Sequence, residues 1–369
     1  MDRLLDLVTG HRRISIVGMC KNAGKTTALN RLISECVSGG IAAALFSVGR
    51  DGEKRDVITN LEKPGIYVEA GTMFATTSGL LEFCEARWEL LFATGARTPL
   101  GEVLVLRARS GGFVELSGPS MNAGIPELTE ALFSRGAEMI LIDGAMSRIA
   151  SASPAVAGCS ILCTGADYDP DLRKVVEDTA HTAQLLSTPG LRDGRVSALL
   201  DSQSGKDVVF IDSGYNMAIA VGKENLNDPD AVPAAYFSNA AFVYFPGALT
   251  DSVCSAALRR LAPAIRSRSP DPAVQFPWSN LSGRDNQPVS KTGFDIIADD
   301  ASKLMISRKM KALLETAGVK IYTRDPIKLS CVCVNPHCTT GPDLNKARFL
   351  REMREAVETP VVNVAEYGE

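Results

Sequence analysis

The sequence is poor in several residue types, and each scarcity narrows the range of functions. Aromatic residues make up 6% of the 369 residues and histidine occurs three times, which limits histidine-based catalysis and histidine-rich metal sites. The formal net charge of -4 provides no general attraction to nucleic acid or anionic lipid. No uninterrupted apolar run approaches the ~18 residues that indicate a membrane span. We therefore expect neither nucleic acid nor a membrane as a partner.

Signals for export and for disulfide bonding are also missing. The first residues, MDRLLDLVTGHRR, have neither the apolar core nor the small-residue cleavage site of a signal peptide. The nine cysteines, an odd number, are scattered among positions typical of a core, as in proteins with reduced thiols. No fixed-period repeat and no low-complexity tract is found. These features together predict a cytoplasmic protein.

The most informative stretch present is ISIVGMCKNAGKTTALN, from Ile14 to Asn30. An apolar run meets a glycine-containing loop, and a helical pattern then begins at Gly24-Lys25-Thr26-Thr27. This is the order of a phosphate-binding P-loop, in which Lys25 reaches the terminal phosphates and the Thr26 hydroxyl ligates Mg²⁺. The residues expected to hold the nucleotide in this loop are Gly18, Lys21, Asn22, Ala23, Gly24, Lys25, Thr26 and Thr27.

The loop has one residue more than the standard motif. Gly18 and Gly24 are six positions apart, whereas G-x-x-x-x-G-K-[ST] places its two glycines five apart. The longer form resembles dethiobiotin synthetase and the cobyrinate amidotransferase synthetases, which belong to the SIMIBI branch of P-loop proteins. Partitioning-type SIMIBI ATPases have a further lysine where this chain has Cys20, and Lys21 follows one position later. The alternative is a coincidental Gly-Lys-Thr in a turn.

Acidic residues follow two of the predicted buried strands. AEMILID, ending at Asp143, has the Walker B pattern and predicts a carboxylate linked to Mg²⁺. With Lys25, Asp143 is therefore a catalytic candidate. The strand from Ile41 to Val48 leads to Asp51 and Glu53 at the edge where α/β sheets bind ligands. We predict Thr26, Asp51 and Asp143 as metal ligands, with Glu53 in reserve; a solvated Asp-Gly turn is the other interpretation of Asp51.

Two further strand ends bear on the choice of nucleotide. GTPases read guanine with N-K-x-D, and the segment from Thr164 to Asp167, TGAD, lacks both the Asn and the Lys, which favours ATP over GTP. Asn335 ends a late strand, CVCVN. In several SIMIBI enzymes such an Asn reads the adenine edge, so Asn335 is a nucleotide-binding candidate if its strand belongs to the P-loop sheet.

Strand and helix patterns alternate along the chain, so the sequence predicts an α/β fold with a mostly parallel sheet. A turn-rich break near residues 187–194 divides it into two expected domains, 1–190 for nucleotide binding and 191–369 as a second α/β domain for a partner or substrate. Locally we expect a helix from about residue 72 to 93, a hairpin around 110–112, a strand at 196–200 and a mobile loop over 266–291.

The ordered segments GMCKNAGKTT, SVGRDGE, LIDGAMSRIASASPAV, ILCTGAD, PGALTD and CVNP resemble one family. It is the P-loop partner protein in the adenosylcobalamin-dependent lysine 5,6-aminomutase system of amino-acid-fermenting bacteria. The resemblance implies a dethiobiotin-synthetase-like nucleotide-binding domain, ATP and Mg²⁺ as cofactors, and an ATPase activity. It also implies that the protein acts with a MutS-like ATPase to reactivate the aminomutase by releasing damaged cobalamin; a homodimer is compatible with this role.

Three other functions remain open at this stage. The first is a carboxylate ligase of the dethiobiotin or cobyrinate synthetase type, and another is a binding module whose P-loop no longer hydrolyses nucleotide. The remaining one is a GTP-binding cofactor-insertion chaperone, for which the best argument is a set of residues of metal-ligand type: Cys331, Cys333, His337 and Cys338. Cys331 and Cys333, however, alternate in a valine-rich strand, a pattern typical of a core face.

Overall fold

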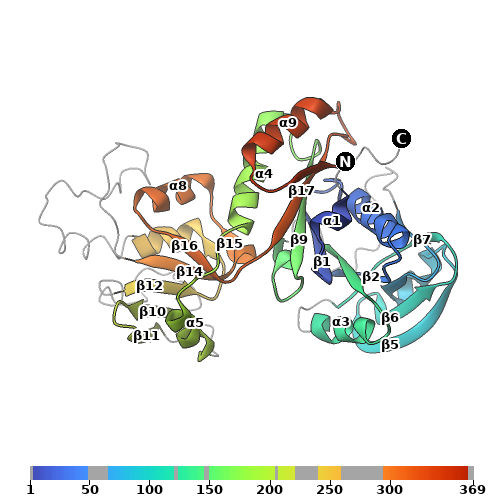
Figure 1. Ribbon diagram of the computed structural model, residues 1–369, viewed down its shortest axis with the longest axis horizontal. Coiled ribbons are helices and arrows are strands. Elements are labelled where there is room, and N and C mark those ends of the chain that lie inside the picture. Colours follow the sequence, from blue (N-terminus) through green and yellow to red (C-terminus); the bar gives the residue numbers. More distant parts are fainter. Residues whose placement is uncertain are drawn as a thin grey trace, which may run out of the picture. The chain divides into compact units, whose positions relative to one another are not determined.

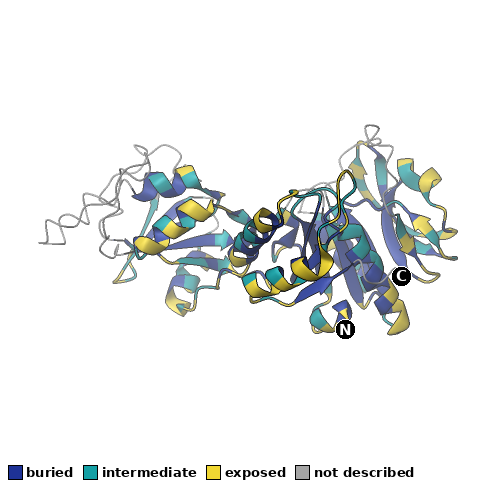
Figure 2. Cartoon of the chain, turned by 90° about the horizontal axis from the view of Figure 1, so that it is seen from above, coloured by how far each residue is buried: buried dark blue, intermediate teal, exposed yellow. Residues whose placement is uncertain are grey.

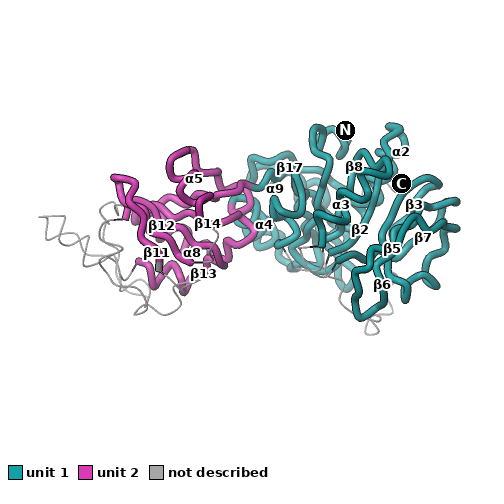
Figure 3. The backbone as a smooth tube through the Cα atoms, turned by 90° about the horizontal axis from the view of Figure 1, so that it is seen from below, with its two compact units in different colours: residues 1–184, 327–369 teal, residues 185–326 magenta. Residues whose placement is uncertain are grey.

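The computed structural model describes residues 3–48, 65–119, 124–144, 149–203, 207–220, 240–258 and 294–364. The chain forms two compact units, one comprising Met1–Gln184 with Ile327–Glu369 and the other Leu185–Pro326 (Figure 3). This division differs from the predicted 1–190 and 191–369, because the chain leaves the second unit at residue 327 and rejoins the first. The second unit is therefore an insertion within the first.

A mixed, mostly parallel sheet of nine described strands forms the centre of the first unit (Figure 1), which confirms the predicted α/β class. Seven neighbouring strands are parallel, and two more follow at one edge, each antiparallel to the strand that precedes it in the sheet. In spatial order they are β18 (Val361–Asn363), β17 (Leu329–Asn335), β9 (Cys159–Gly165), β1 (Arg13–Gly18), β8 (Met139–Gly144), β2 (Ala43–Val48), β4 (Met73–Thr77), β6 (Gly101–Ala108) and β5 (Trp88–Thr98). A small antiparallel pair joins β3 (Ile66–Val68) and β7 (Gly112–Val114).

Helices cover both faces of this sheet, so its central strands are buried on both sides (Figure 2). Leu29 packs in one core cluster with Leu45, whereas Leu128 packs in the other with Phe46. Adjacent residues of one strand thus face opposite layers, which explains the continuous apolar runs in the sequence. The described helices are α1 (Leu4–Leu7), α2 (Lys25–Ser38), α3 (Ile125–Phe133), α4 (Leu172–Leu186), α9 (Lys346–Ala356) and two 3₁₀ helices, at Ser78–Phe83 and Ile149–Ala152.

The second unit has a smaller mixed sheet of its own. Three neighbouring strands are parallel, and two more follow at one edge, each antiparallel to the strand that precedes it in the sheet. The spatial order is β11 (Met217–Ala220), β10 (Val208–Asp212), β12 (Ala240–Phe245), β14 (Asp295–Asp300) and β16 (Ile321–Asp325). The other elements include α5 (Gly194–Asp201), α8 (Arg308–Thr316), a 3₁₀ turn at Ala301–Lys303 and the parallel pair of β13 (Leu249–Thr250) and β15 (Leu304–Met305). Residues 251–258 are helical as well.

Three local predictions were wrong. Residues 72–93 form β4, a 3₁₀ helix at Ser78–Phe83 and the start of β5, not one helix. The hairpin joins β5 to β6 across Pro99 and Leu100, where a proline followed by Gly101 at φ 107° favours the turn over the expected one at 110–112. Residues 196–200 lie in α5, because the Asp193 side chain accepts the backbone N–H groups that begin a helix.

Two expectations cannot be compared with the structure. The predicted loop at 266–291 lies outside the described residues, as do Asp51 and Glu53. Among the residues that are described, no helix is both long and apolar enough to cross a membrane.

Candidate functional site

The predicted site residues gather at one edge of the nine-stranded sheet. β1, β8, β9 and β17 are parallel, so their carboxyl ends reach the same edge, bringing Gly18, Asp143 and Asn335 to it from distant parts of the chain. In the sheet, β8 and β2 lie on one side of β1, whereas β9 and β17 lie on its other side. Open α/β sheets bind ligands at the point where the strand order changes direction in this way.

The loop between β1 and α2, residues 19–24, is called the motif loop here. Its backbone alternates in handedness, since Asn22 has φ 59° and Gly24 has φ 91° whereas Ala23 between them has no positive φ. Backbone of this kind forms a concave nest of N–H groups that binds anions. Gly24 is the N-cap of α2 without a side-chain cap, and the first turn of the helix has no acidic residue. The positive end of the helix dipole therefore faces the same place.

Lys25 is bent back along the motif loop. Its ammonium donates a hydrogen bond to the carbonyl oxygen of Cys20 at 3.0 Å. A Cβ at Gly18 would lie 2.9 Å from Lys25 Nζ and 3.0 Å from its Cδ, so a larger residue at this position would displace the lysine side chain from this conformation. The longer loop therefore still holds the lysine charge within the motif loop, at Cys20.

Cys20 cannot take the place of a second lysine, because a thiol has no positive charge in either protonation state. Burial raises the pKa of its thiol to about 11, against the opposing effect of the Lys25 charge, so the group is neutral at pH 7. Lys21, Thr26 and Thr27 are half-buried at the end of the motif loop and in the first turn of α2.

Asp143 is the half-buried penultimate residue of β8, between fully buried neighbours. Its register partners are Ile16 on β1 and Ser47 on β2, so its strand lies directly beside the one that leads into the motif loop. Carboxylate and hydroxyl oxygens of this edge, on Asp143 and Thr26, are of the type that Mg²⁺ takes. Within the described ranges no three His, Cys, Asp or Glu side chains are already grouped around a metal position.

Asn335 contacts the motif loop directly. Its strand, β17, belongs to the same sheet as β1, which was the condition attached to its nucleotide-binding role. Its Nδ2 donates to the carbonyl oxygen of Asn22 at 3.2 Å, and its Oδ1 accepts from the backbone N–H of His337 at 3.3 Å. A Cβ at Gly24 would lie 2.9 Å from the Cβ of Asn335. The contact to the motif loop is therefore close as well as polar.

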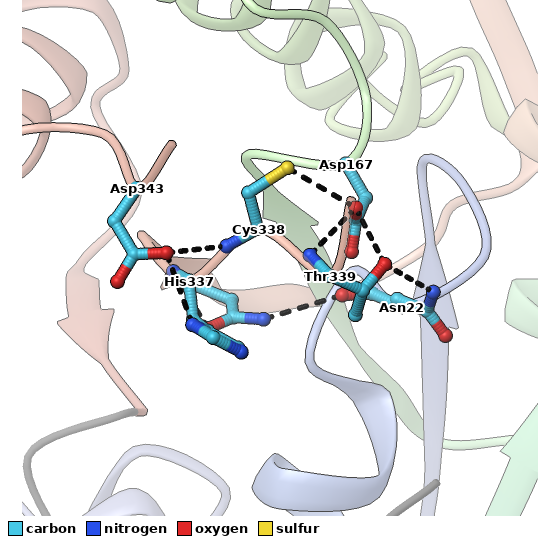
Figure 4. Close-up of polar contacts among 7 residues, drawn as sticks. Asn22, Asp167, His337, Cys338, Thr339 and Asp343 are labelled. Carbon is cyan, nitrogen blue, oxygen red and sulfur yellow. Dashed lines mark hydrogen bonds and ion pairs between the residues drawn. The ribbon is translucent and has the colours of Figure 1, made fainter. Parts of the chain in front are cut away.

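The structure adds Asp167 and Thr339, which were not predicted as site residues. Asp167 Oδ1 accepts hydrogen bonds from the backbone N–H of Thr339 at 3.0 Å and from its hydroxyl at 2.9 Å (Figure 4). Asn22 Nδ2 in turn donates to the Thr339 hydroxyl at 3.1 Å. The signal for Asp167 was present in the sequence, because it is an acid just after a buried strand, like Asp143. Thr339 had no such signal.

The four cysteine and histidine residues of metal-ligand type do not form one cluster. Cys331 and Cys333 are fully buried in β17, and hydrogen bonds with Cys163 and Cys331, followed by burial, raise the pKa of Cys333 well above its ordinary value. Thiols held protonated in this way are poor metal ligands. His337 Nδ1 instead lies 3.0 Å from Asp343, and the Cys338 thiol lies 3.4 Å from Asp167 (Figure 4).

Comparisons with known proteins add no further assignment: no family model, curated protein or solved structure matches the chain.

Proposed function

We propose that the motif loop is a P-loop and that the protein binds and hydrolyses a nucleoside triphosphate with Mg²⁺. The observation that carries this proposal is the backbone nest at residues 22–24, continuous with the uncapped N-terminus of α2 and accompanied by the Lys25 ammonium. Backbone N–H groups, a helix dipole and a lysine together match the charge of a triphosphate. A coincidental Gly-Lys-Thr in a turn would require none of these features.

Each residue has a separate part in this proposal. Lys25 binds the terminal phosphates, and the N–H groups of the motif loop bind phosphate oxygens. Thr26 and Asp143 hold Mg²⁺, with Asp51 as a further ligand from sequence. The bound ion would neutralise charge on the phosphates. These residues fit the group because the edge supplies hard oxygen ligands beside an anion-binding backbone.

ATP is the proposed nucleotide. The β9 strand is followed by TGAD, which lacks the Asn and Lys with which GTPases accompany the guanine-reading Asp. The Asp of this segment is also occupied, because Asp167 accepts three hydrogen bonds from Cys338 and Thr339. A carboxylate occupied in this way is less available to read guanine.

The biological role proposed is reactivation of a cobalamin-dependent aminomutase together with a MutS-like ATPase, on the strength of the ordered motifs. Nucleotide turnover would drive release of damaged cofactor only if the ATP and ADP states bind the mutase with different affinities. The second unit, Leu185–Pro326, is the proposed partner-binding part. The buried cysteines of β17 give no support to the cofactor-insertion alternative.

Calorimetric titration of Mg-ATP into the parent protein and into Lys25→Ala tests the nucleotide site. Loss of charge-assisted hydrogen bonds of ~2 kcal/mol predicts at least a tenfold weaker affinity for the variant. Lys311→Ala, in the exposed Lys311–Glu315 pair of α8 in the other unit, removes a lysine without touching the site and should bind like the parent. Equal affinity of parent and Lys25→Ala would overturn the proposal.

A further inference from the structure

A chain of hydrogen bonds connects the turn after β9, the loop after β17 and the motif loop (Figure 4). The Thr339 hydroxyl is its central member: it donates to Asp167 Oδ1 and accepts from Asn22 Nδ2. A hydroxyl can do both at once, because it has one donor hydrogen and acceptor lone pairs. The direction of the chain is fixed by its ends, since a carboxylate only accepts and the amide nitrogen only donates.

At the motif-loop end of this chain of hydrogen bonds, Asn22 has an unusual backbone conformation. Asn22 is one of two non-glycine residues with a positive φ among those described, at 59°. Asparagine adopts this region more readily than most residues, but still at a cost relative to the right-handed region. Its side chain is held by Thr339 and its carbonyl by Asn335, so contacts on both sides offset that cost.

The carboxylate end is anchored firmly. Asp167 Oδ1 takes the backbone N–H and the hydroxyl of Thr339, so Thr339 is fixed by both its main chain and its side chain. Asp167 Oδ2 is buried and has no hydrogen-bond partner within the described structure. An unpaired buried carboxylate oxygen lowers stability, which indicates that this arrangement is kept for a purpose other than stability.

We propose that Asp167 and Thr339 are positioning residues for phosphate binding. Through the Asn22 amide they hold the motif loop in its left-handed conformation, so that the nest at residues 22–24 exists before the nucleotide arrives. A loop that is already ordered loses little conformational entropy when the nucleotide binds, so the affinity is not reduced by that cost. The inference rests on the proposed nucleotide function and names residues outside the sequence motif that this function needs.

The test is a double-mutant cycle on Mg-ATP affinity with Thr339→Val and Asn22→Gly. Thr339→Val keeps the shape and the backbone N–H bond to Asp167 but removes the hydroxyl, and it should weaken binding about fivefold. In the Asn22→Gly background there is no amide to hold, so the same Thr339→Val change should have no further effect. Thr339→Ser, which restores the hydroxyl, should bind within about twofold of the parent.

Thermal unfolding of each variant separates positioning from stability. The expected result is a loss of affinity in Thr339→Val with only a small fall in melting temperature, because two side-chain hydrogen bonds are lost while the Asp167 bond to the main chain of Thr339 remains. If Thr339→Val binds like the parent, or loses the same factor with and without Asn22, the positioning inference is overturned. Lys25→Ala in the same series distinguishes the two proposals. If Lys25→Ala binds Mg-ATP more weakly but Thr339→Val binds like the parent, the nucleotide site is supported and only the positioning inference is overturned. If the parent protein does not bind Mg-ATP, both proposals are overturned.

Discussion

Position 24 of the motif loop requires glycine, both for its backbone conformation and for lack of space. Its φ of 91° belongs to the left-handed region, and an added Cβ would meet Asn335 at 2.9 Å and Val364 at 3.2 Å. The left-handed φ disfavours any residue with a Cβ, and the same Cβ would also collide with Asn335. The glycine of the sequence motif is therefore needed by the fold of the loop as well as by the approach of phosphate.

Gly24→Ala should lower both stability and nucleotide affinity. Left-handed strain and the contact with Asn335 together predict a loss of about 2 kcal/mol in the free energy of unfolding. Gly40→Ala is the matched control, because Gly40 has φ 69° and nothing within 4 Å of an added Cβ. That control should cost about 1 kcal/mol and leave Mg-ATP binding unchanged. Urea unfolding and calorimetry measure the two quantities, and equal effects of the two variants would contradict the steric argument.

At the scale of elements, α2 links the site to both ends of the described chain. Arg31 and Glu35 form a buried pair on this helix, with Arg31 Nε 2.9 Å from Glu35 Oε1. Glu35 Oε2 accepts the backbone N–H of Leu5 in α1 at 2.7 Å, and Arg31 donates to the carbonyl of Asn363 in β18 at 3.5 Å. The helix that starts at the motif loop is therefore fixed to the first helix and the last strand.

Glu35→Ala should destabilise the protein much more than removal of an exposed pair. It leaves the Arg31 charge buried without its carboxylate, which costs about 3 kcal/mol. Glu352→Ala removes the corresponding partner of Arg348 in α9, another pair one helical turn apart, in which the arginine side chain is 57% exposed. The expected cost there is below about 1 kcal/mol. Urea denaturation of both variants measures the difference, and similar midpoints would show that the buried pair contributes little.

On the scale of the whole molecule, the nine cysteines are all free, and most of them are core residues. Burial raises the pKa of Cys36 and Cys159 to about 11, as it does for Cys20. The folded state therefore keeps these protons at a pH where the unfolded chain has lost them. Because the folded pKa lies above the unfolded value of 9.0, the stabilisation is complete below pH 9 and is lost as the pH rises toward 11.

Alkaline titration of the folded protein checks this directly. Ultraviolet absorbance of the thiolate should stay low in native protein at pH 10 and rise when urea is added at the same pH. The free energy of unfolding should also be lower at pH 10 than at pH 7.5. Native thiolate absorbance that rises around pH 9 for all nine cysteines would show that the core thiols are not protected by burial.

The sequence by itself determined the parts that depend on neighbouring residues. Apolar runs, the Gly24-Lys25-Thr26 turn into a helix and the acid after an apolar strand are local patterns, and they were enough to predict the α/β class, Lys25 and Asp143 as candidates. Predictions from local patterns were wrong where a segment had similar propensities for helix and for strand. Residues 88–93, the end of the expected helix, became part of the edge strand β5, because pairing with β6 across a turn at Pro99 prevailed over the predicted helix.

Only the tertiary structure decided which distant segments meet. The return of the chain at residue 327 placed β17 beside β9, so Asn335 reached Asn22 of the motif loop, which lies 313 positions away along the chain. The Asn22–Thr339 and Asp167–Thr339 bonds join residues 317 and 172 positions apart, and no local pattern encodes such a pairing. Strand order in a sheet follows from how whole hydrophobic faces are buried together, and that is a property of the complete fold.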